Sequence, residues 1–196
     1  MGRRGEPLRD HILQAAKRVF LERGFERASM DEVAARAQTS KRTLYAHFKS
    51  KQQLFFAVIE MVRRLALAHL KPPATYSARP ADALARYLAS YLAVMRLAPA
   101  VQMMRITIAE AERFPRAAEQ HHDALFGLAA TQLAAYLAAT FALSPRASAD
   151  AAQRLLAQVL FPVLPRALFG LDDPRRAIRP RELRRAVAGV IASLDI

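Results

Sequence analysis

No cysteine occurs among the 196 residues of the sequence. Its absence excludes disulfides, thiolate zinc sites and cysteine nucleophiles, and it is compatible with a reducing compartment. The basic N-terminal residues are not followed by an apolar run, so a secretory signal is not expected. The alternating apolar pattern of β-strands is also missing, whereas apolar residues recur at helical spacing along the chain. The sequence therefore predicts an all-α protein, which we expect to be cytoplasmic.

Motifs typical of enzymes are missing as well. The sequence has no phosphate-binding loop, no G-x-S-x-G and no H-E-x-x-H. Glu110 and Glu112 are two residues apart, so they point to different faces of a helix. His121 and His122 are adjacent, and adjacent helical side chains diverge by about 100°, unlike the i, i+4 pairs that chelate a metal. We predict a protein with no catalytic activity, no cofactor and no bound metal.

Acidic residues are scarce relative to basic ones. The chain has 17 Asp and Glu against 30 Lys and Arg, a formal net charge of +13. This excess predicts a polyanionic partner, nucleic acid first and an anionic membrane second. A general bias toward arginine is the alternative, because every cation after Lys71 is Arg. Residues 1–71 carry 15 basic and 7 acidic side chains, more than half of the excess, so we expect a nucleic-acid site there.

The segment from Ala124 to Pro145 carries no charge at all. Its length is close to the roughly 20 residues of a membrane span. However, it is rich in alanine and contains Thr131, Gln132 and Thr140. Two interpretations are open, a membrane span and a buried central helix, and we favour the buried helix.

Prolines and glycines mark the ends of the expected helices. Nine are predicted, at about residues 7–23, 29–37, 40–48, 51–70, 80–97, 99–113, 115–143, 148–169 and from Pro180 onward. Pro162 and Pro165 should kink or break the eighth helix. The segment from Lys71 to Pro80 is the expected linker between an N-terminal domain at 6–66 and a C-terminal domain at 77–196.

Residues 29–48 have the pattern of a helix-turn-helix. The helix starts carry capping residues: Ser29 with Glu32, Ser40, and Ser50 with Gln53. In the second helix Leu44 and Phe48 share the core face, whereas Arg42 and Tyr45 lie on the opposite face. A short helix that is apolar behind and rich in hydrogen-bond donors in front suits the major groove of DNA.

The residue types on this motif suggest their roles. Lys41 and Arg42 are expected to donate to guanine N7 and O6. Lys51 begins a helix, where amides and dipole favour an anion, so a phosphate is expected beside it. The predicted DNA-binding residues are Ser29, Met30 (through its amide), Thr39, Ser40, Lys41, Arg42, Thr43, Tyr45, His47 and Lys51. Arg3 and Arg4 are either a basic arm that reaches the DNA or a solvated tail.

Residues 12–59 resemble the DNA-binding domain of the TetR family of bacterial transcriptional regulators. The resemblance rests on Ile12, Leu13, Ala15, Ala16, Val19, Phe20, Gly24, Phe25, Ser29, Met30, Val33, Ala34, Ala37, Ser40, Lys41, Thr43, Leu44, Tyr45, His47, Phe48, Ser50, Lys51, Leu54 and Phe55. Residues 105–115, RITIAEAERFP, are similar to the AefR-type branch. One departure lies in the turn, where the family often has glycine and this chain has Gln38. A Gln at positive φ costs on the order of 1 kcal/mol.

The resemblance implies a nine-helix all-α fold with a three-helix DNA-binding domain and a helical ligand-binding and dimerisation domain. It implies a homodimer, formed by the last two helices, that binds a double-stranded DNA operator. It also implies an unknown small-molecule effector, and the fourth helix would transmit the presence of this effector to the DNA-binding helices. The apolar stripe on the last helix supports a dimer interface, assigned to Leu183, Val187, Val190, Ile191 and Leu194.

Met and aromatic side chains in the C-terminal part suit an adaptable apolar pocket, although they also suit a plain core. The candidate pocket residues are Tyr87, Tyr91, Met95, Met103, Met104, Phe114, His122, Phe126 and Phe161. For the two histidines, the alternatives are that His122 lines this pocket and that both side chains are solvated.

The sequence thus predicts a DNA-binding transcriptional regulator, in the usual mode of the family a repressor that an effector releases from an inverted-repeat operator. The alternative is a non-specific architectural DNA-binding protein without an effector, whose affinity would depend on salt alone. A protein that binds membrane surfaces through its arginine-rich last helix is a further rival, and we expect no membrane partner.

Overall fold

The computed structural model describes residues 6–68, 70–171 and 179–194, so the predicted arm at Arg3 and Arg4 lies outside the described residues. The described part of the chain is helical and contains no strand, which confirms the all-α prediction. It forms two compact units. Unit 1 comprises Met1–Leu65 with Gln102–His121, and unit 2 comprises Ala66–Val101 with His122–Ile196. The predicted domains divide the chain differently, because residues 102–121 pack with the first helices.

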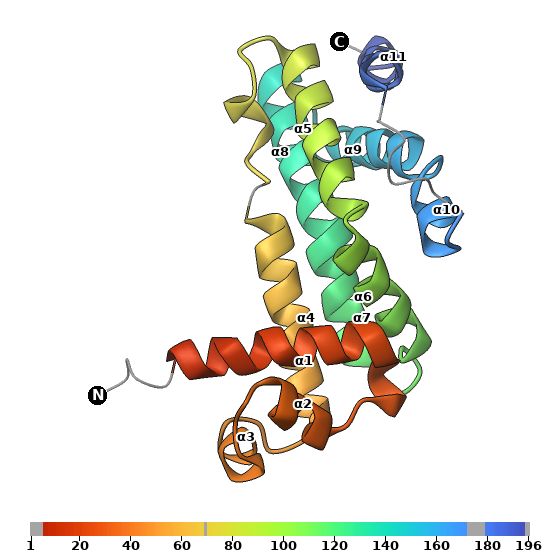
Figure 1. The fold of residues 1–196 in the computed structure, drawn as a ribbon. Coiled ribbons are helices and arrows are strands. Elements are labelled where there is room, and N and C mark those ends of the chain that lie inside the picture. Colours follow the sequence, from red (N-terminus) through yellow and green to blue (C-terminus); the bar gives the residue numbers. More distant parts are fainter. Residues whose placement is uncertain (1–5, 69, 172–178, 195–196) are drawn as a thin grey trace. The chain divides into compact units, whose positions relative to one another are not determined.

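Unit 1 contains the predicted helix-turn-helix. Its helices are α1 (Glu6–Arg27), α2 (Met30–Arg36), α3 (Lys41–His47), α4 (Lys51–Leu67), the end of α6 (Ala98–Ala109) and α7 (Pro115–His122). In Figure 1, α2 and α3 lie beneath α1. The apolar residues of these helices form one core that also includes Met103, Phe114 and Ala117.

Aromatic rings dominate this core. The Phe114 ring contacts the Phe25 ring at 5.1 Å and the Phe56 ring at 5.4 Å between centroids. Phe25 also packs on Phe55 at 4.9 Å and on Phe20 at 6.1 Å. Gly24 makes this possible, because its φ of 75° turns the chain back toward α1, as predicted for a glycine at a helix end.

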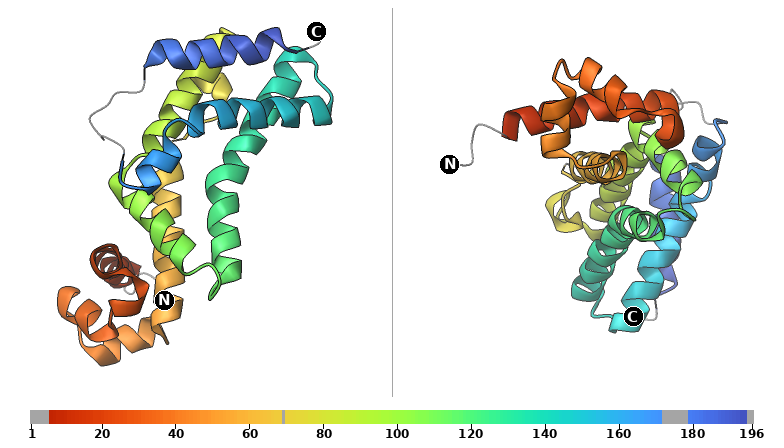
Figure 2. Two further views of the ribbon diagram at one scale, coloured as in Figure 1. Left: turned by 90° about the vertical axis from the view of Figure 1, so that its right-hand side faces the viewer. Right: turned by 90° about the horizontal axis from the view of Figure 1, so that it is seen from below.

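Unit 2 is a packed set of helices. It contains η1 (Pro73–Thr75), α5 (Pro80–Met95), the π-helical turn η2 (Asp123–Gly127), α8 (Leu128–Phe141), α9 (Pro145–Leu160), α10 (Leu164–Leu168) and α11 (Pro180–Ala192). Figure 1 shows α5 beside α8, and the left view of Figure 2 shows α11 alongside α9. Pro162 lies in the break between α9 and α10, as predicted.

The uncharged segment predicted as one helix is interrupted. A π-helical turn separates α7 from α8, and the carbonyl of Leu125 in that turn accepts a hydrogen bond of 3.1 Å from the Tyr91 hydroxyl. By length and composition alone, Pro115–Phe141 could cross a membrane. Core helices of soluble proteins pass the same test, but they are mostly buried, whereas 22% of the apolar window of this segment is buried. Leu133 and Leu137 of α8 are among its buried residues, and the buried central helix stays a prediction.

Candidate nucleic-acid interface

The turn between α2 and α3 closes with two backbone hydrogen bonds. The amide of Gln38 donates to Ala35 O at 3.1 Å, and the amide of Thr39 donates to Ala34 O at 3.0 Å. This is a Schellman motif, in which the residue after the C-cap adopts positive φ. Gln38 has a φ of 49°, so the turn keeps the geometry expected for glycine in spite of the glutamine.

The start of α3 is fixed by its N-cap. The Ser40 hydroxyl accepts a hydrogen bond of 3.0 Å from the amide of Thr43 and lies 2.8 Å from the Thr43 hydroxyl. Behind the helix, Leu44 and Phe48 are buried in the core of unit 1, as predicted. The Arg9 guanidinium lies over the Phe48 ring at 5.3 Å, which connects α1 to the end of the motif.

The opposite face of α3 is exposed. Lys41, Arg42 and Ala46 are all exposed, and Tyr45 keeps 45% of its surface accessible. Of the other predicted DNA-binding residues, Thr39, Thr43 and His47 are half-buried, and Met30 is buried with its amide in the first turn of α2. The helix therefore presents two cations and a phenol from a rigid, internally capped support, which suits contacts to base edges.

Asp31 lies within this exposed face. Its carboxylate is 2.7 Å from the Lys41 ammonium, and both side chains are more than 60% exposed. Asp31 is absent from the predicted set, because ten residues and a turn separate it from Lys41 and only the folded motif brings the two together. If Lys41 contacts DNA as predicted, a carboxylate at this position competes with the phosphates for its ammonium group.

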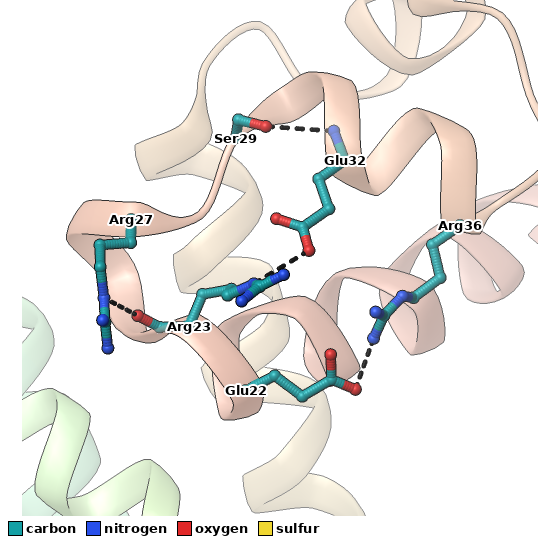
Figure 3. A network of polar contacts seen from close by, with 6 residues as sticks. All are labelled: Glu22, Arg23, Arg27, Ser29, Glu32 and Arg36. Carbon is teal, nitrogen blue, oxygen red and sulfur yellow. Dashed lines mark hydrogen bonds and ion pairs between the residues drawn. The ribbon is translucent and has the colours of Figure 1, made fainter.

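Ion pairs hold α2 against α1. Figure 3 shows the Glu22 carboxylate accepting from Arg36 at 2.5 Å and the Glu32 carboxylate accepting from Arg23 at 3.2 Å. The hydrogen bond from Arg36 lowers the pKa of Glu22. The Ser29 hydroxyl accepts from the Glu32 amide at 3.1 Å, so the first half of the predicted capping box is present, while the Glu32 carboxylate pairs with α1.

Lys51 is engaged within the protein. Its ammonium donates to the carbonyls of Phe25, Glu26 and Ala28 at 2.9 to 3.0 Å and lies 4.6 Å from the centroid of the Phe25 ring. All three N–H donors of the lysine therefore have partners. Carbonyls at the end of α1 thus stabilise this cation without a phosphate, and a phosphate contact stays a prediction.

Residues of α6 and of the segment that follows it contact α1 inside unit 1. The Arg113 guanidinium pairs with Glu26 and lies 5.2 Å from the Phe25 and Phe114 ring centroids. The Gln102 side chain donates to Leu21 O at 2.6 Å. Residues 102–121 therefore contact the end of α1, which precedes the helix-turn-helix.

Comparison with known proteins identifies the family of the chain. Residues 12–58 match the family model of bacterial regulatory proteins of the TetR family. Residues 82–193, more than half of the chain, match the C-terminal domain of AefR-like transcriptional repressors. The chain belongs to the TetR family. It is therefore a transcriptional regulator with a DNA-binding helix-turn-helix, and the prediction that it is not an enzyme is confirmed by its family.

Individual relatives match short stretches of this TetR-family protein. The activator FasR of Mycolicibacterium smegmatis is 50% identical over 52 residues, 26% of this chain and 24% of that protein. The regulator UidR of Escherichia coli K12 is 41% identical over 68 residues, 35% of each chain. The chain thus spans only about a quarter to a third of the length of these relatives.

Solved structures match over nearly the whole chain. A TetR-family regulator from Mesorhizobium loti superposes with a TM-score of 0.77 at 26% identity and covers 96% of both chains. The flavonoid-responsive regulator FrrA superposes with a TM-score of 0.75 at 26% identity, covering 95% of this chain and 94% of that one. The all-α TetR-like fold is thereby confirmed, and among the described residues α10 and the π-helical turn divide two of the nine predicted helices.

The candidate pocket residues are divided between the units of this TetR-family chain. Tyr87, Tyr91 and Met95 are buried in unit 2, whereas Met103, Met104 and Phe114 are buried in unit 1. In unit 2, His122 is exposed, Phe126 is half-buried and Phe161 is 79% exposed. The Tyr87 hydroxyl donates to Gln132 at 3.0 Å, and burial raises the pKa of both buried tyrosines. Phe114 belongs to the aromatic core, and the pocket assignment of the whole set stays a prediction.

The apolar stripe on α11 is covered within the chain. Leu183, Val187 and Val190 are buried against other helices of unit 2, with α5 and α9 as the neighbours of α11. Ile191 and Leu194 are half-buried. The stripe therefore does not by itself require a second copy of the chain, and the dimer interface at these five residues stays a prediction.

Proposed function

We propose that this TetR-family regulator is a repressor that binds an inverted-repeat operator as a homodimer in the cytoplasm. The observation that carries the proposal is the exposed face of α3, which presents Lys41, Arg42 and Tyr45 on a helix held by Leu44 and Phe48. The match to AefR-like repressors supports repression rather than activation. A twofold dimer implies two half-sites about one helical turn of DNA, or a multiple of it, apart.

We further propose that a small, mostly apolar effector releases the DNA. The contacts of Arg113 and Gln102 with α1 support this step, because they connect the α6–α7 segment to the DNA-binding helices inside one compact unit. The flavonoid response named for FrrA, a relative at 26% identity, favours an aromatic effector as a first class to screen.

Selection of genomic fragments with the purified protein tests the proposal. We expect recovered fragments to share an inverted repeat, and Arg42→Ala to relax the preference at one base position per half-site by roughly 1–3 kcal/mol. Ala46→Ser on the same exposed face is a control that alters no cation. Recovery of unrelated fragments, with an affinity that depends on salt alone, would identify the protein as a non-specific architectural binder instead.

A further inference from the structure

Unit 1 contains a small pocket between α4 and α7. It has a volume of about 50 Å³ and is partly open to solvent. Its lining residues are Phe56, Ile59, Glu60, Arg63, Ala117, Gln120 and His121. None of them belongs to the residues predicted to line the effector pocket, so this pocket is a separate candidate for a ligand.

His121 is the unusual residue of this pocket. Its side chain is 95% buried, since only 5% of its surface is accessible. Neither ring nitrogen has a hydrogen-bond partner, and among the described residues these are the only buried side-chain nitrogen or oxygen atoms in that state. An unpaired buried polar group costs about 1–3 kcal/mol, and native proteins retain few of them. The imidazole is therefore expected to find a partner that enters the pocket.

The protonation state of His121 defines that partner. Burial, and secondarily the charge of Arg63, lower its pKa from 6.5 to about 4, so the ring is neutral near pH 7. A neutral imidazole has one N–H donor and one nitrogen acceptor, which point in different directions. A hydroxyl group is suited to either nitrogen, because it both donates and accepts, whereas a carboxylate can serve only the donor and an ammonium only the acceptor.

The charges of the lining residues and the volume of the pocket further restrict the class of ligand. The Arg63 guanidinium donates through two nitrogens to the Glu60 carboxylate, so the charges in the lining compensate one another and favour a neutral ligand. Phe56, Ile59 and Ala117 supply an apolar wall. The volume exceeds the roughly 10–15 Å³ needed by a water molecule but falls short of the cavity of about 150 Å³ that holds a benzene ring. The pocket thus has room for the polar end of a molecule whose apolar body stays at the opening.

We propose that this pocket binds the hydroxyl group of a small neutral alcohol or phenol, with a ring nitrogen of His121 as its hydrogen-bond partner. The second ring nitrogen then forms a hydrogen bond with a water molecule or a second hydroxyl group. The proposal concerns binding within unit 1 and holds whether or not the ligand releases DNA.

Nuclear magnetic resonance of the His121 ring nitrogens in the full-length protein tests the proposal. Benzyl alcohol is the probe, and ethylbenzene, of the same shape without the hydroxyl, is its control. We expect a saturable shift of a His121 nitrogen with benzyl alcohol, which should bind about tenfold more tightly than ethylbenzene if the hydroxyl contributes one net hydrogen bond. The other histidines of the chain serve as internal references.

Variants at two adjacent positions identify the residue responsible. His121→Leu should abolish the preference for benzyl alcohol, and His121→Gln, which keeps a donor and an acceptor, should retain part of it. His122→Gln should leave the preference unchanged, because His122 is exposed and pairs with Asp123 at 3.1 Å. Equal binding of the two probes to the native protein, or no saturable shift, would overturn the proposal and leave ordered water as the partner of the imidazole.

Discussion

Lys51 illustrates how a single side chain can have two plausible partners. It begins α4, where the helix N-terminus favours an anion such as phosphate. Its ammonium nevertheless donates to three carbonyls at the end of α1. Carbonyls at the C-terminal end of a helix carry partial negative charge, and the Lys51 ammonium compensates this charge inside the protein. Lys51 therefore connects α1 to α4, and its contact with a DNA phosphate stays a prediction.

Replacing this lysine separates the two roles. We expect Lys51→Met to lower the free energy of unfolding by roughly 1.5–3 kcal/mol, the range for hydrogen bonds to a charged group, with the salt dependence of DNA binding unchanged. Urea unfolding and a salt titration of DNA affinity measure the two quantities. Lys49→Met, at an exposed neighbouring position, is the control. A salt slope reduced by about one unit, at unchanged stability, would restore the phosphate contact.

Asp31 forms an ion pair with Lys41, which is predicted to contact DNA. Because the pair is exposed, its free energy is at most about 1 kcal/mol. We expect Asp31→Asn to raise the affinity for operator and random DNA alike by up to about fivefold, since the change frees a cation and removes a repulsive charge. Fluorescence anisotropy with both DNA types measures this effect. Asp150→Asn, an equal charge change in unit 2, should have little effect, and equal gains from both variants would exclude a local role for Asp31.

At the scale of elements, the turn between α2 and α3 stores backbone strain. Gln38 has a φ of 49° in a Schellman motif that glycine would enter without cost. Ala142, after α8 in unit 2, adopts a similar conformation with a φ of 52°. Both helices end at these turns because the backbone hydrogen bonds and the packing of the next element outweigh the preference of Gln38 and Ala142 for negative φ.

Glycine at either position should stabilise the protein. We expect Gln38→Gly and Ala142→Gly each to raise the melting temperature by about 2–4 °C, the shift that corresponds to roughly 1 kcal/mol in a chain of this size. Gln38→Ala keeps the strain and is the matched control in the turn. A melting temperature that falls for Gln38→Gly would mean that the glutamine side chain contributes more than the strain removes.

Helices and caps follow local rules, and the sequence predicts them well. Ser40, Leu44 and Pro180 stand at the start, the buried face and the first turn of their helices, as spacing and capping indicate. Contacts between distant segments are different. The pairing of Asp31 with Lys41 and the packing of Phe114 on Phe25 depend on tertiary approach, which periodicity does not encode.

In the C-terminal part, too, the spacing of apolar residues does not reveal which segments pack against each other. The stripe on α11 predicts a buried face, and that face is buried, but spacing alone does not reveal whether the cover comes from α5 and α9 or from another chain. The π-helical turn at Asp123–Gly127 is not predicted either, because the segment from Ala124 onward is uncharged and rich in alanine, so its apolar pattern has no clear period.

At the scale of the whole molecule, His121 makes stability depend on pH. Its pKa is about 4 in the folded chain and 6.5 as a free side chain, so below pH 6.5 the unfolded state binds a proton that the folded state excludes. The stabilisation by the neutral ring is complete above pH 6.5 and is lost as the pH falls toward 4. The linkage amounts to roughly 1.4 kcal/mol for each pH unit in this interval.

Denaturation at several pH values measures this linkage. Between pH 7 and pH 5 we expect the native protein to lose about 2 kcal/mol more of its unfolding free energy than His121→Leu loses. His122→Gln should follow the native protein, because the exposed neighbour does not share the burial of His121. The same loss in the leucine variant would show that other groups cause the acid sensitivity.

The packing of residues 102–121 into unit 1 also affects how this regulator can be recombined with its relatives. Phe114 fills the aromatic core around Phe25, and Arg113 holds the end of α1. A chimera joined in the predicted linker, between Lys71 and Pro80, would carry the helix-turn-helix but would lack Phe114 and Arg113. The graft would then expose an apolar surface, unless the host supplies residues of matching shape. A transferable DNA-binding head of this protein consequently consists of two separate stretches of sequence.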